Sequence, residues 1–226
     1  MSFVSGFFYN LMMTIEDINR QIQTLPQTAF GVSVPALRKL AREIARADYR
    51  GFIKQNPNNS FELKMLHAFV LGYAKDDIGV LLKSFEEFIP QVDGWAVNDA
   101  LCQNFKIARR YLDVVWKFLM KYRRSKKEFE SRVVAVMLLS HFLTDEYIDR
   151  VLDVLNTLDT GAYYSQMGVA WAVATAMGKY PHKCMAFLRS PTCRLDGATY
   201  QKSLQKIRES FRVSDFIKQQ TWKLAK

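Results

Sequence analysis

An indole and a carboxylate stand four residues apart in the segment VDGWAVNDALC, at Trp95 and Asp99. On a helix this spacing places both side chains on the same face, one above the other. Asp93 is the more natural N-cap of such a helix, whereas Asp99 lies a full turn inside it among apolar neighbours. The alternative is a buried indole beside an aspartate that merely complements the helix dipole. If the shared face lines a groove, the pair predicts a carboxylate that works beside an aromatic surface.

Two further residues, Arg132 and Trp171, are candidates for the same functional site. Arg132 lies at the edge of the apolar stripe in FESRVVAVMLLSHFL, where a guanidinium needs a carboxylate or phosphate partner. A surface pairing with Glu128, one turn earlier, is the alternative. Trp171 follows Tyr163 and Tyr164 in YYSQMGVAWAVATAMGKYP. An aromatic run among alanines and valines is also typical of a hydrophobic core. Trp171 is therefore either a site residue or a core residue.

Basic residues dominate the charge, with 32 Lys and Arg against 22 Asp and Glu, a net charge of +10 and a pI near 9.5. Polyanions are the partners that such an excess favours. Between residues 106 and 127, Asp113 is the lone carboxylate, which favours phosphate contacts over a merely solvated helix face. None of these residues predicts readout of base edges, so binding should be largely insensitive to sequence. The expected DNA-binding cations are Arg38, Lys106, Arg109, Arg110, Lys121, Arg123, Arg124, Lys202 and Lys206.

Other enzyme classes find little support in the sequence. It contains no P-loop, no G-x-G-x-x-G and no G-x-S-x-G, and His67, His141 and His182 lack the spacing of metal ligands. The three cysteines form no C-x-x-C pair, which argues against a zinc site or a disulfide framework and indicates a reducing compartment. We therefore expect no metal and no cofactor. His67 and His141 fall on apolar stripes and are expected in the core.

The N-terminal segment MSFVSGFFYNLMM is apolar, but it has no basic n-region and no small-residue cleavage pattern. We expect it to be the first helix of the fold rather than a signal peptide. No stretch approaches the roughly 18 uninterrupted apolar residues of a membrane span. The sequence therefore predicts a cytoplasmic protein without a membrane partner.

Apolar residues recur at helical spacing through nearly the whole chain, and alternating strand patterns are hard to find. Ser33 with Pro35, Asn58 to Ser60, Asp76 with Asp77, Ser125, and Thr144 mark expected helix starts. The expected helices cover 34–48, the segment from the Asn58–Ser60 cap to about Lys75, the segment from Asp76 to Pro90, 94–104, 107–123, 126–142, 145–158, 162–179, 182–189, 198–211 and 214–224.

Short connections force consecutive helices to lie antiparallel, and the helix pairs recur every 35 to 40 residues, the spacing of HEAT-like repeats. We therefore predict an all-α protein, a HEAT-like α-solenoid formed by a single domain over residues 1–226. A compact helical bundle is the alternative. One helix from each pair of a solenoid builds a continuous concave face, here expected to be basic and suited to an elongated ligand such as duplex DNA.

Several of these features together resemble the AlkD-like DNA alkylation repair family. The resemblance runs from about Phe30 to Arg212 and is carried by FGVSVPALRKLAREIA, by W-x-x-x-D at Trp95 and Asp99, by Arg132 in its helix, and by the AW pair ending at Trp171. Ala174 departs from it, because a basic residue is expected there in the best-known active branch.

The resemblance implies a HEAT-like repeat glycosylase that excises N3- and N7-alkylated purines from duplex DNA, without a cofactor and without flipping the damaged base. By this resemblance, Asp99 is the catalytic carboxylate, and Trp95 and Trp171 contact the deoxyribose. Arg132 holds the DNA backbone nearby. We expect the protein to act as a monomer.

Elementary chemistry agrees with this assignment. An alkylated purine already carries positive charge and leaves without a general acid, while an oxocarbenium-like cation develops on the sugar. A single carboxylate that faces this cation and positions water is sufficient in principle, and indole faces add cation–π attraction. Two alternatives remain, a non-catalytic solenoid of the same superfamily that binds duplex or branched DNA, and a protein-interaction scaffold.

Overall fold

The structure is a computed structural model that describes residues 13–29 and 31–224. Apart from Met13, the apolar segment expected to form the first helix lies outside the described residues. The elements are α1 (Ile15–Thr24), β1 (Gln27–Thr28), β2 (Gly31–Val32), α2 (Val34–Gln55), α3 (Phe61–Tyr73), α4 (Ile78–Phe88), the 3-10 helix η1 (Ile89–Gln91), α5 (Trp95–Asn104), the 3-10 helix η2 (Lys106–Arg110), α6 (Leu112–Met120), α7 (Glu128–His141), α8 (Ile148–Leu155), α9 (Tyr163–Lys179), α10 (Pro181–Arg189), α11 (Gly197–Glu209) and α12 (Asp215–Trp222).

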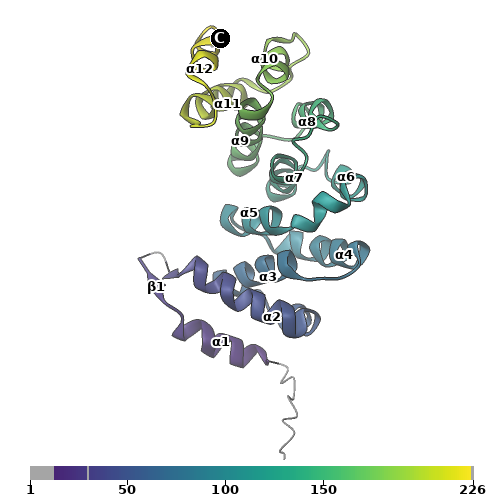
Figure 1. Cartoon of the computed structure of the whole chain (residues 1–226), viewed down its shortest axis with the longest axis vertical. Helices are drawn as coiled ribbons and strands as arrows, with labels where there is room; N and C mark the ends of the chain where they lie inside the picture. The colour runs from purple at the N-terminus through teal and green to yellow at the C-terminus, as the bar shows by residue number, and fades with distance from the viewer. Residues whose placement is uncertain (1–12, 30, 225–226) are drawn as a thin grey trace, which may run out of the picture.

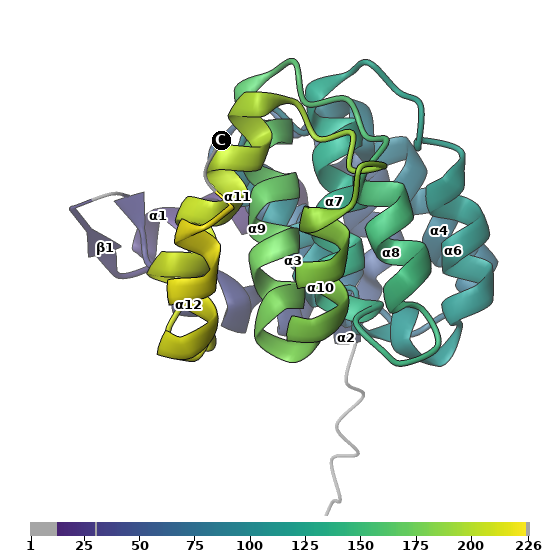
Figure 2. The same cartoon turned by 90° about the horizontal axis from the view of Figure 1, so that it is seen from above.

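The helices are stacked in chain order along the long axis, from α1 at one end to α12 at the other (Figure 1). Helix α3 packs on α5, α7 packs on α5 and α9, and α11 packs on α9. We call α3, α5, α7, α9 and α11 the inner row, and α4, α6, α8 and α10 the outer row. Figure 2, viewed along the stack, separates α4, α6 and α8 on one side from α9 and α11 on the other. This arrangement confirms the predicted all-α solenoid.

The repeat spacing expected from the sequence is visible in the side-chain contacts between successive helix pairs. Many hydrogen bonds join residues one repeat apart, and the sequence separation varies little among them. Examples are Lys183–Asp149 at 34 residues, Lys121–Glu86 at 35, and Tyr164–Glu128 and Thr160–Asp196 at 36. Each helix pair is therefore bonded through polar side chains to the pair before it, as nearest-neighbour stacking requires.

Some of the predicted helix caps are confirmed. Ser60 accepts a hydrogen bond from the backbone N–H of Leu63 at the start of α3. Asp77 accepts one from Gly79 at the start of α4, with an oxygen–nitrogen distance of 2.7 Å. Such caps satisfy backbone donors that have no partner within the helix.

Other caps were predicted wrongly. Gly94 rather than Asp93 precedes α5, because Asp93 instead forms an ion pair with Lys64 at 2.5 Å. Lys127 rather than Ser125 precedes α7, and the Ser125 hydroxyl donates to Glu130 at 2.6 Å. The N-cap of α5 therefore lies one residue after the predicted cap, and the N-cap of α7 lies two residues after it.

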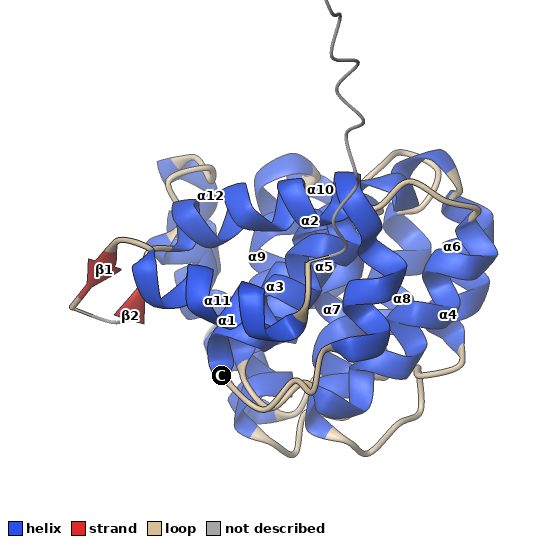
Figure 3. Cartoon of the chain, turned by 90° about the horizontal axis from the view of Figure 1, so that it is seen from below, coloured by secondary structure: helices blue, strands red, loops and turns tan. Residues whose placement is uncertain are grey.

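Several helix boundaries also differ. The helix expected over 107–123 divides into η2 and α6, and α2 continues past the predicted end at 48 through a kink at Asp48 to Gln55. Neither α1 nor the β1–β2 hairpin was predicted, and the hairpin lies at the edge of the stack, where Figure 3 draws its strands in red. Among the described residues, no helix combines the length and apolar character needed to cross a bilayer.

One apolar core runs the length of the stack, from Ile18 in α1 to Val213 after α11. As predicted, His67 and His141 are buried in it, and His67 is 4% exposed. The His67 ring stacks on Phe88 with centroids 3.9 Å apart, and its Nδ1 lies 3.1 Å from the amide oxygen of Asn58. Burial lowers the pKa of His67 to about 3. The ring is therefore neutral at neutral pH and donates from Nδ1, because an amide oxygen can only accept.

Burial of His67 makes the folded state sensitive to acid. Below pH 6.5 the unfolded chain binds a proton that the folded chain excludes, so the stabilisation present above pH 6.5 is lost as pH falls towards 3. We expect His67→Gln to reduce the slope of unfolding free energy against pH by up to about 1.4 kcal/mol per pH unit. Urea unfolding between pH 4 and 7 measures this slope, with the exposed His182→Gln as the matched control. Equal slopes in His67→Gln and the wild type would contradict a neutral buried ring.

Candidate active site

A buried ion pair joins two neighbouring helices of the inner row. Asp99 of α5 accepts from Arg132 of α7, with Nε to Oδ1 at 3.0 Å and Nη2 to Oδ2 at 2.9 Å. The side chains of Arg132 and Asp99 are 6% and 12% exposed. Two parallel hydrogen bonds fix the plane of the carboxylate as well as its distance from the guanidinium. The carboxylate partner of the Arg132 guanidinium is therefore Asp99 rather than Glu128.

A third helix holds Arg132 in place. Its Nη1 donates to the backbone carbonyl of Tyr164 in α9 at 2.8 Å, and the N–H of Tyr164 donates to Glu128 at 2.5 Å. Gly168 lets α9 approach closely, because a Cβ atom there would lie 3.2 Å from the Cγ of Arg132. Three successive inner helices therefore fix the orientation of the Asp99 carboxylate.

The burial of this pair has electrostatic consequences. Burial raises the pKa of Asp99 above its usual value, and the hydrogen bonds and charge of Arg132 oppose that rise. Burial also raises the pKa of the nearby Cys102 thiol well above its usual value. The site therefore offers an arginine-held carboxyl group and no thiolate nucleophile.

The ion pair lines a cavity of about 610 Å³ on the inner row. Trp95, which is 55% exposed, and the half-buried Trp171 contribute indoles to the same cavity. The structure thus brings together all four residues predicted as catalytic. They come from α5, α7 and α9, so their proximity depends on the stacking of consecutive repeats.

A further part of the cavity lining comes from the end of α11 and the turn after it. Lys206 lies there, bonded to Glu209 at 3.1 Å, together with the fully exposed Phe211 and with Arg212. Ala174, where the family resemblance leads one to expect a basic residue, also lines the cavity. Arg212 and Lys206 line the same cavity, where Glu209 offsets the charge of Lys206.

Sequence reasoning did not identify Phe211 as a site residue. It lies outside any helix, in the turn that follows α11, and no periodic pattern marks it. Its position beside the cavity follows from the fold, because the end of α11 meets the middle of α9.

The predicted DNA-binding cations are scattered over the structure. Lys206 lines the Asp99 cavity, and Arg109 lines a neighbouring cavity that shares Thr175 and Arg212 with it. Arg38 donates to Asn104 at 2.6 Å, with its guanidinium 4.3 Å from the centroid of the Phe69 ring. Lys202 is bonded to Gln205, and Lys106 and Arg110 are exposed on η2. The DNA-binding roles of these residues stay predictions.

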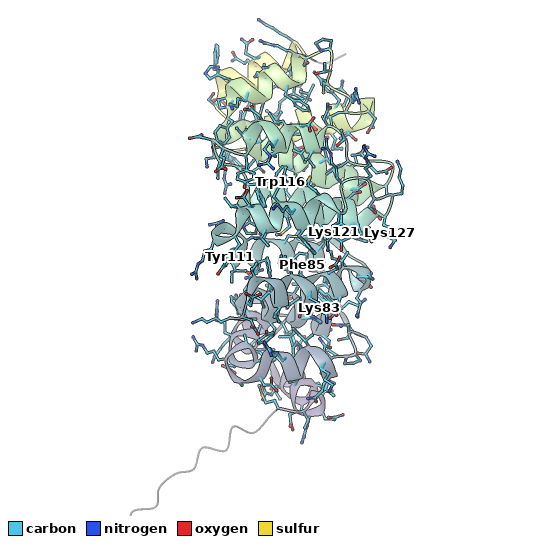
Figure 4. The ribbon with its side chains drawn as sticks, turned by 90° about the vertical axis from the view of Figure 1, so that its right-hand side faces the viewer. Lys83, Phe85, Tyr111, Trp116, Lys121 and Lys127 are labelled. Carbon is cyan, nitrogen blue, oxygen red and sulfur yellow. The ribbon has the colours of Figure 1, made fainter. Side chains whose placement is uncertain are left out.

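Basic residues of the segment 106–127 form ion pairs with carboxylates of neighbouring repeats. Lys121 pairs with Glu86 at 3.1 Å and Arg123 with Asp153 at 2.8 Å. Lys121 and Lys127 belong to the side of the molecule viewed in Figure 4, on which the outer row faces the viewer. Arg124 lines a cavity with Arg123 and Asp153. The shortage of acidic residues within the segment is therefore no evidence that Lys121 or Arg123 contacts phosphate.

No group of three or more His, Cys, Asp or Glu side chains within residues 13–29 and 31–224 is arranged to hold a metal ion. What the site offers is a fixed carboxylate, two indoles and nearby cations. The fold and the site together define a helical-repeat solenoid with an arginine-held carboxylate on its inner row.

Comparison with known families identifies the class more closely. The model of the DNA alkylation repair enzyme family matches residues 18–207, which confirms the resemblance seen in the sequence. The chain belongs to this DNA alkylation repair enzyme family. Searches among curated proteins and among solved structures gave no match to this chain.

The buried pair predicts a large loss of stability when the cation alone is removed. We expect Arg132→Met to cost about 3 to 5 kcal/mol of unfolding free energy, because it leaves a buried carboxylate without a partner. Adding Asp99→Leu to that variant should restore most of the loss. Guanidinium unfolding at pH 7 measures both. In the exposed pair Lys183–Asp149, Lys183→Met is the matched control and should cost less than about 1 kcal/mol. A similar small cost for Arg132→Met would contradict the buried pair.

Proposed function

We propose that this family member is a monofunctional DNA glycosylase that removes positively charged N3- and N7-alkylated purines from duplex DNA without flipping the base. The observation that supports this most strongly is the position of Asp99, which lines the same cavity as two indoles while Arg132 fixes its orientation. Membership of the DNA alkylation repair enzyme family supports DNA as the partner.

In the proposed reaction the bond between the sugar C1′ and the purine nitrogen breaks. Both bonding electrons go to the cationic base, which leaves neutral, so no proton has to be supplied. The sugar becomes an oxocarbenium-like cation, and the Asp99 carboxylate stabilises it electrostatically. Water then adds to C1′ and gives up a proton to Asp99 or to solvent, which leaves a hydroxyl group on the sugar.

The surrounding residues suit this chemistry. Arg132 fixes the carboxylate before substrate arrives, so little reorganisation is needed as charge develops. The indoles of Trp95 and Trp171 offer π-faces to the same developing cation. Trp95 is exposed at the cavity. This suits a sugar that remains in the duplex, because the protein can contact such a sugar only at its own surface.

One observation favours a second candidate, a DNA-binding protein without glycosylase activity. Both oxygens of Asp99 already accept bonds from Arg132, and Asp99 as a whole is 8% exposed. A carboxylate held in this way has the arrangement of a structural ion pair. This candidate predicts salt-dependent binding of DNA and no release of bases.

Replacing the carboxylate by its neutral isostere separates the two candidates. We expect Asp99→Asn to slow release of 7-methylguanine or 3-methyladenine from methylated duplex DNA by on the order of 100-fold, because electrostatic stabilisation of the sugar cation is lost. Affinity for unmodified duplex should not fall, because Asp99 is not a phosphate contact and its neutralisation leaves the positive charge of Arg132 beside the cavity. Chromatographic detection of free bases measures the first quantity, and fluorescence anisotropy measures the second.

The matched control is Asp149→Asn, which neutralises an exposed carboxylate on α8. Its rate of base release should equal that of the wild type. Undiminished release by Asp99→Asn would refute the catalytic role of Asp99. Absence of release by the wild type, with DNA binding intact, would favour the non-catalytic candidate.

A further inference from the structure

The Asp99 carboxylate is recessed, whereas two aromatic rings at the same cavity are exposed. Asp99 is 8% exposed, and Arg132, which holds it, is 5% exposed. Trp95 and Phe211 line the same cavity but are 55% and 103% exposed. The sugars of a regular duplex are tied by the backbone to stacked neighbours, so none of them can enter a recess alone. A duplex that lies across the inner row therefore meets the exposed rings before a sugar reaches Asp99.

The chain on both sides of Phe211 is held in place. Val213 is buried in the core. The N–H of Arg212 donates to the Oγ of Ser210 at 3.2 Å. The same turn lies close to α9 at Gly178, where a Cβ atom would lie 3.4 Å from the carbonyl oxygen of Arg212. The turn is therefore fixed against α9, while the Phe211 ring projects into solvent at the cavity.

The position of Phe211 distinguishes it from other exposed aromatic residues. Its ring is fully exposed, so burial of the ring does not stabilise the fold. A single exposed apolar side chain is common on protein surfaces. Phe216 and Trp222 of α12 are also exposed, at 68% and 65%, but they do not line the Asp99 cavity. Phe211 alone among these three rings can contact a nucleotide whose sugar faces Asp99.

We propose that Phe211 is a wedge that enters the base stack beside the damaged nucleotide and kinks the duplex, so that the sugar moves into the cavity towards Asp99. The proposal rests on the function proposed above for the identity of that sugar. Apolar side chains such as phenylalanine, inserted at a base step, unstack it in part and bend the DNA. The ring then stacks on the base that it uncovers, which offsets the cost of opening the step.

A wedge explains how a recessed carboxylate acts without a pocket for an extruded base. Kinking the backbone displaces the sugar, while the damaged base stays within the duplex. Opening the stack also costs least where the base is damaged, because its stacking and pairing are already weakened. Phe211 therefore contributes to the choice of damaged over intact sites as well as to the position of the sugar.

The fluorescence of 2-aminopurine tests the wedge directly, because stacking quenches the emission of this base. The probe duplex carries 2-aminopurine beside a 7-methylguanine whose sugar has fluorine at C2′, which disfavours the sugar cation and keeps the base attached. We expect saturating wild type to raise the emission about fivefold, and Phe211→Ala to leave it within about 1.5-fold of the free duplex. Phe211→Leu should retain about half of the rise, because leucine also serves as a wedge.

Phe216→Ala is the matched control, because it removes an exposed aromatic ring that does not line the cavity. It should raise the emission as much as wild type. Both alanine variants lose only an exposed ring, so their thermal midpoints should stay within about 2 °C of wild type. Fluorescence anisotropy establishes that each variant is saturating. The wedge is overturned if Phe211→Ala raises the emission as wild type does, or if wild type does not raise it.

Base release gives a second readout that separates the wedge from a direct contact with the sugar. We expect Phe211→Ala to slow release from methylated duplex by about tenfold relative to wild type, because the stacking of one base on the ring is lost. Release from methylated single strands should be the same in both proteins, because a single strand needs no wedge. An equal loss on single strands would assign Phe211 to the sugar and overturn the wedge.

The emission experiment does not depend on glycosylase activity. A rise that requires Phe211, without release of bases by wild type, supports the wedge and removes the proposed activity. Normal release by wild type, with equal emission in wild type and Phe211→Ala, removes the wedge and leaves the proposed role of Asp99 intact.

Discussion

The buried pair between Asp99 and Arg132 is the interaction on which the site depends. It joins helices that are one repeat apart, 33 residues in sequence, and it lies almost entirely out of water. Taking two charges out of water is costly, and the paired bonds of the guanidinium and the carbonyl of Tyr164 offset that cost. The stacking of α5, α7 and α9 and the orientation of the carboxylate therefore depend on each other.

This dependence connects the fold with the proposed chemistry. A solenoid lets each inner helix present a few side chains to one continuous surface, and the cavity collects them from several repeats. A carboxylate fixed in this way cannot rotate away from a sugar that is becoming positive. The proposed mechanism needs no second carboxylate, because a cationic purine leaves without an acid.

The sequence predicted the helices, the repeat spacing and the four residues that converge on the cavity, because helical periodicity and the order of motifs are local properties. It did not predict that Arg132 pairs with Asp99, since the pairing depends on the register of α5 against α7. The basic run containing Lys121 and Arg123 was misleading for the same reason, because its carboxylates lie in other repeats. Asp93 and Ser125 were wrong as caps, because α5 and α7 begin one and two residues later than the sequence indicated. Phe211 lies in a turn, where no periodicity marks it.

The most direct test of the central claim is the affinity of the protein for two duplexes that differ in one sugar. One duplex carries a cationic pyrrolidine in place of the deoxyribose, and the other carries a neutral tetrahydrofuran. A carboxylate that stabilises the sugar cation should make the wild type bind the cationic duplex at least about tenfold more tightly, and Asp99→Asn should abolish that preference. Equal affinity of the wild type for both duplexes, or a preference that survives in Asp99→Asn, would contradict the account.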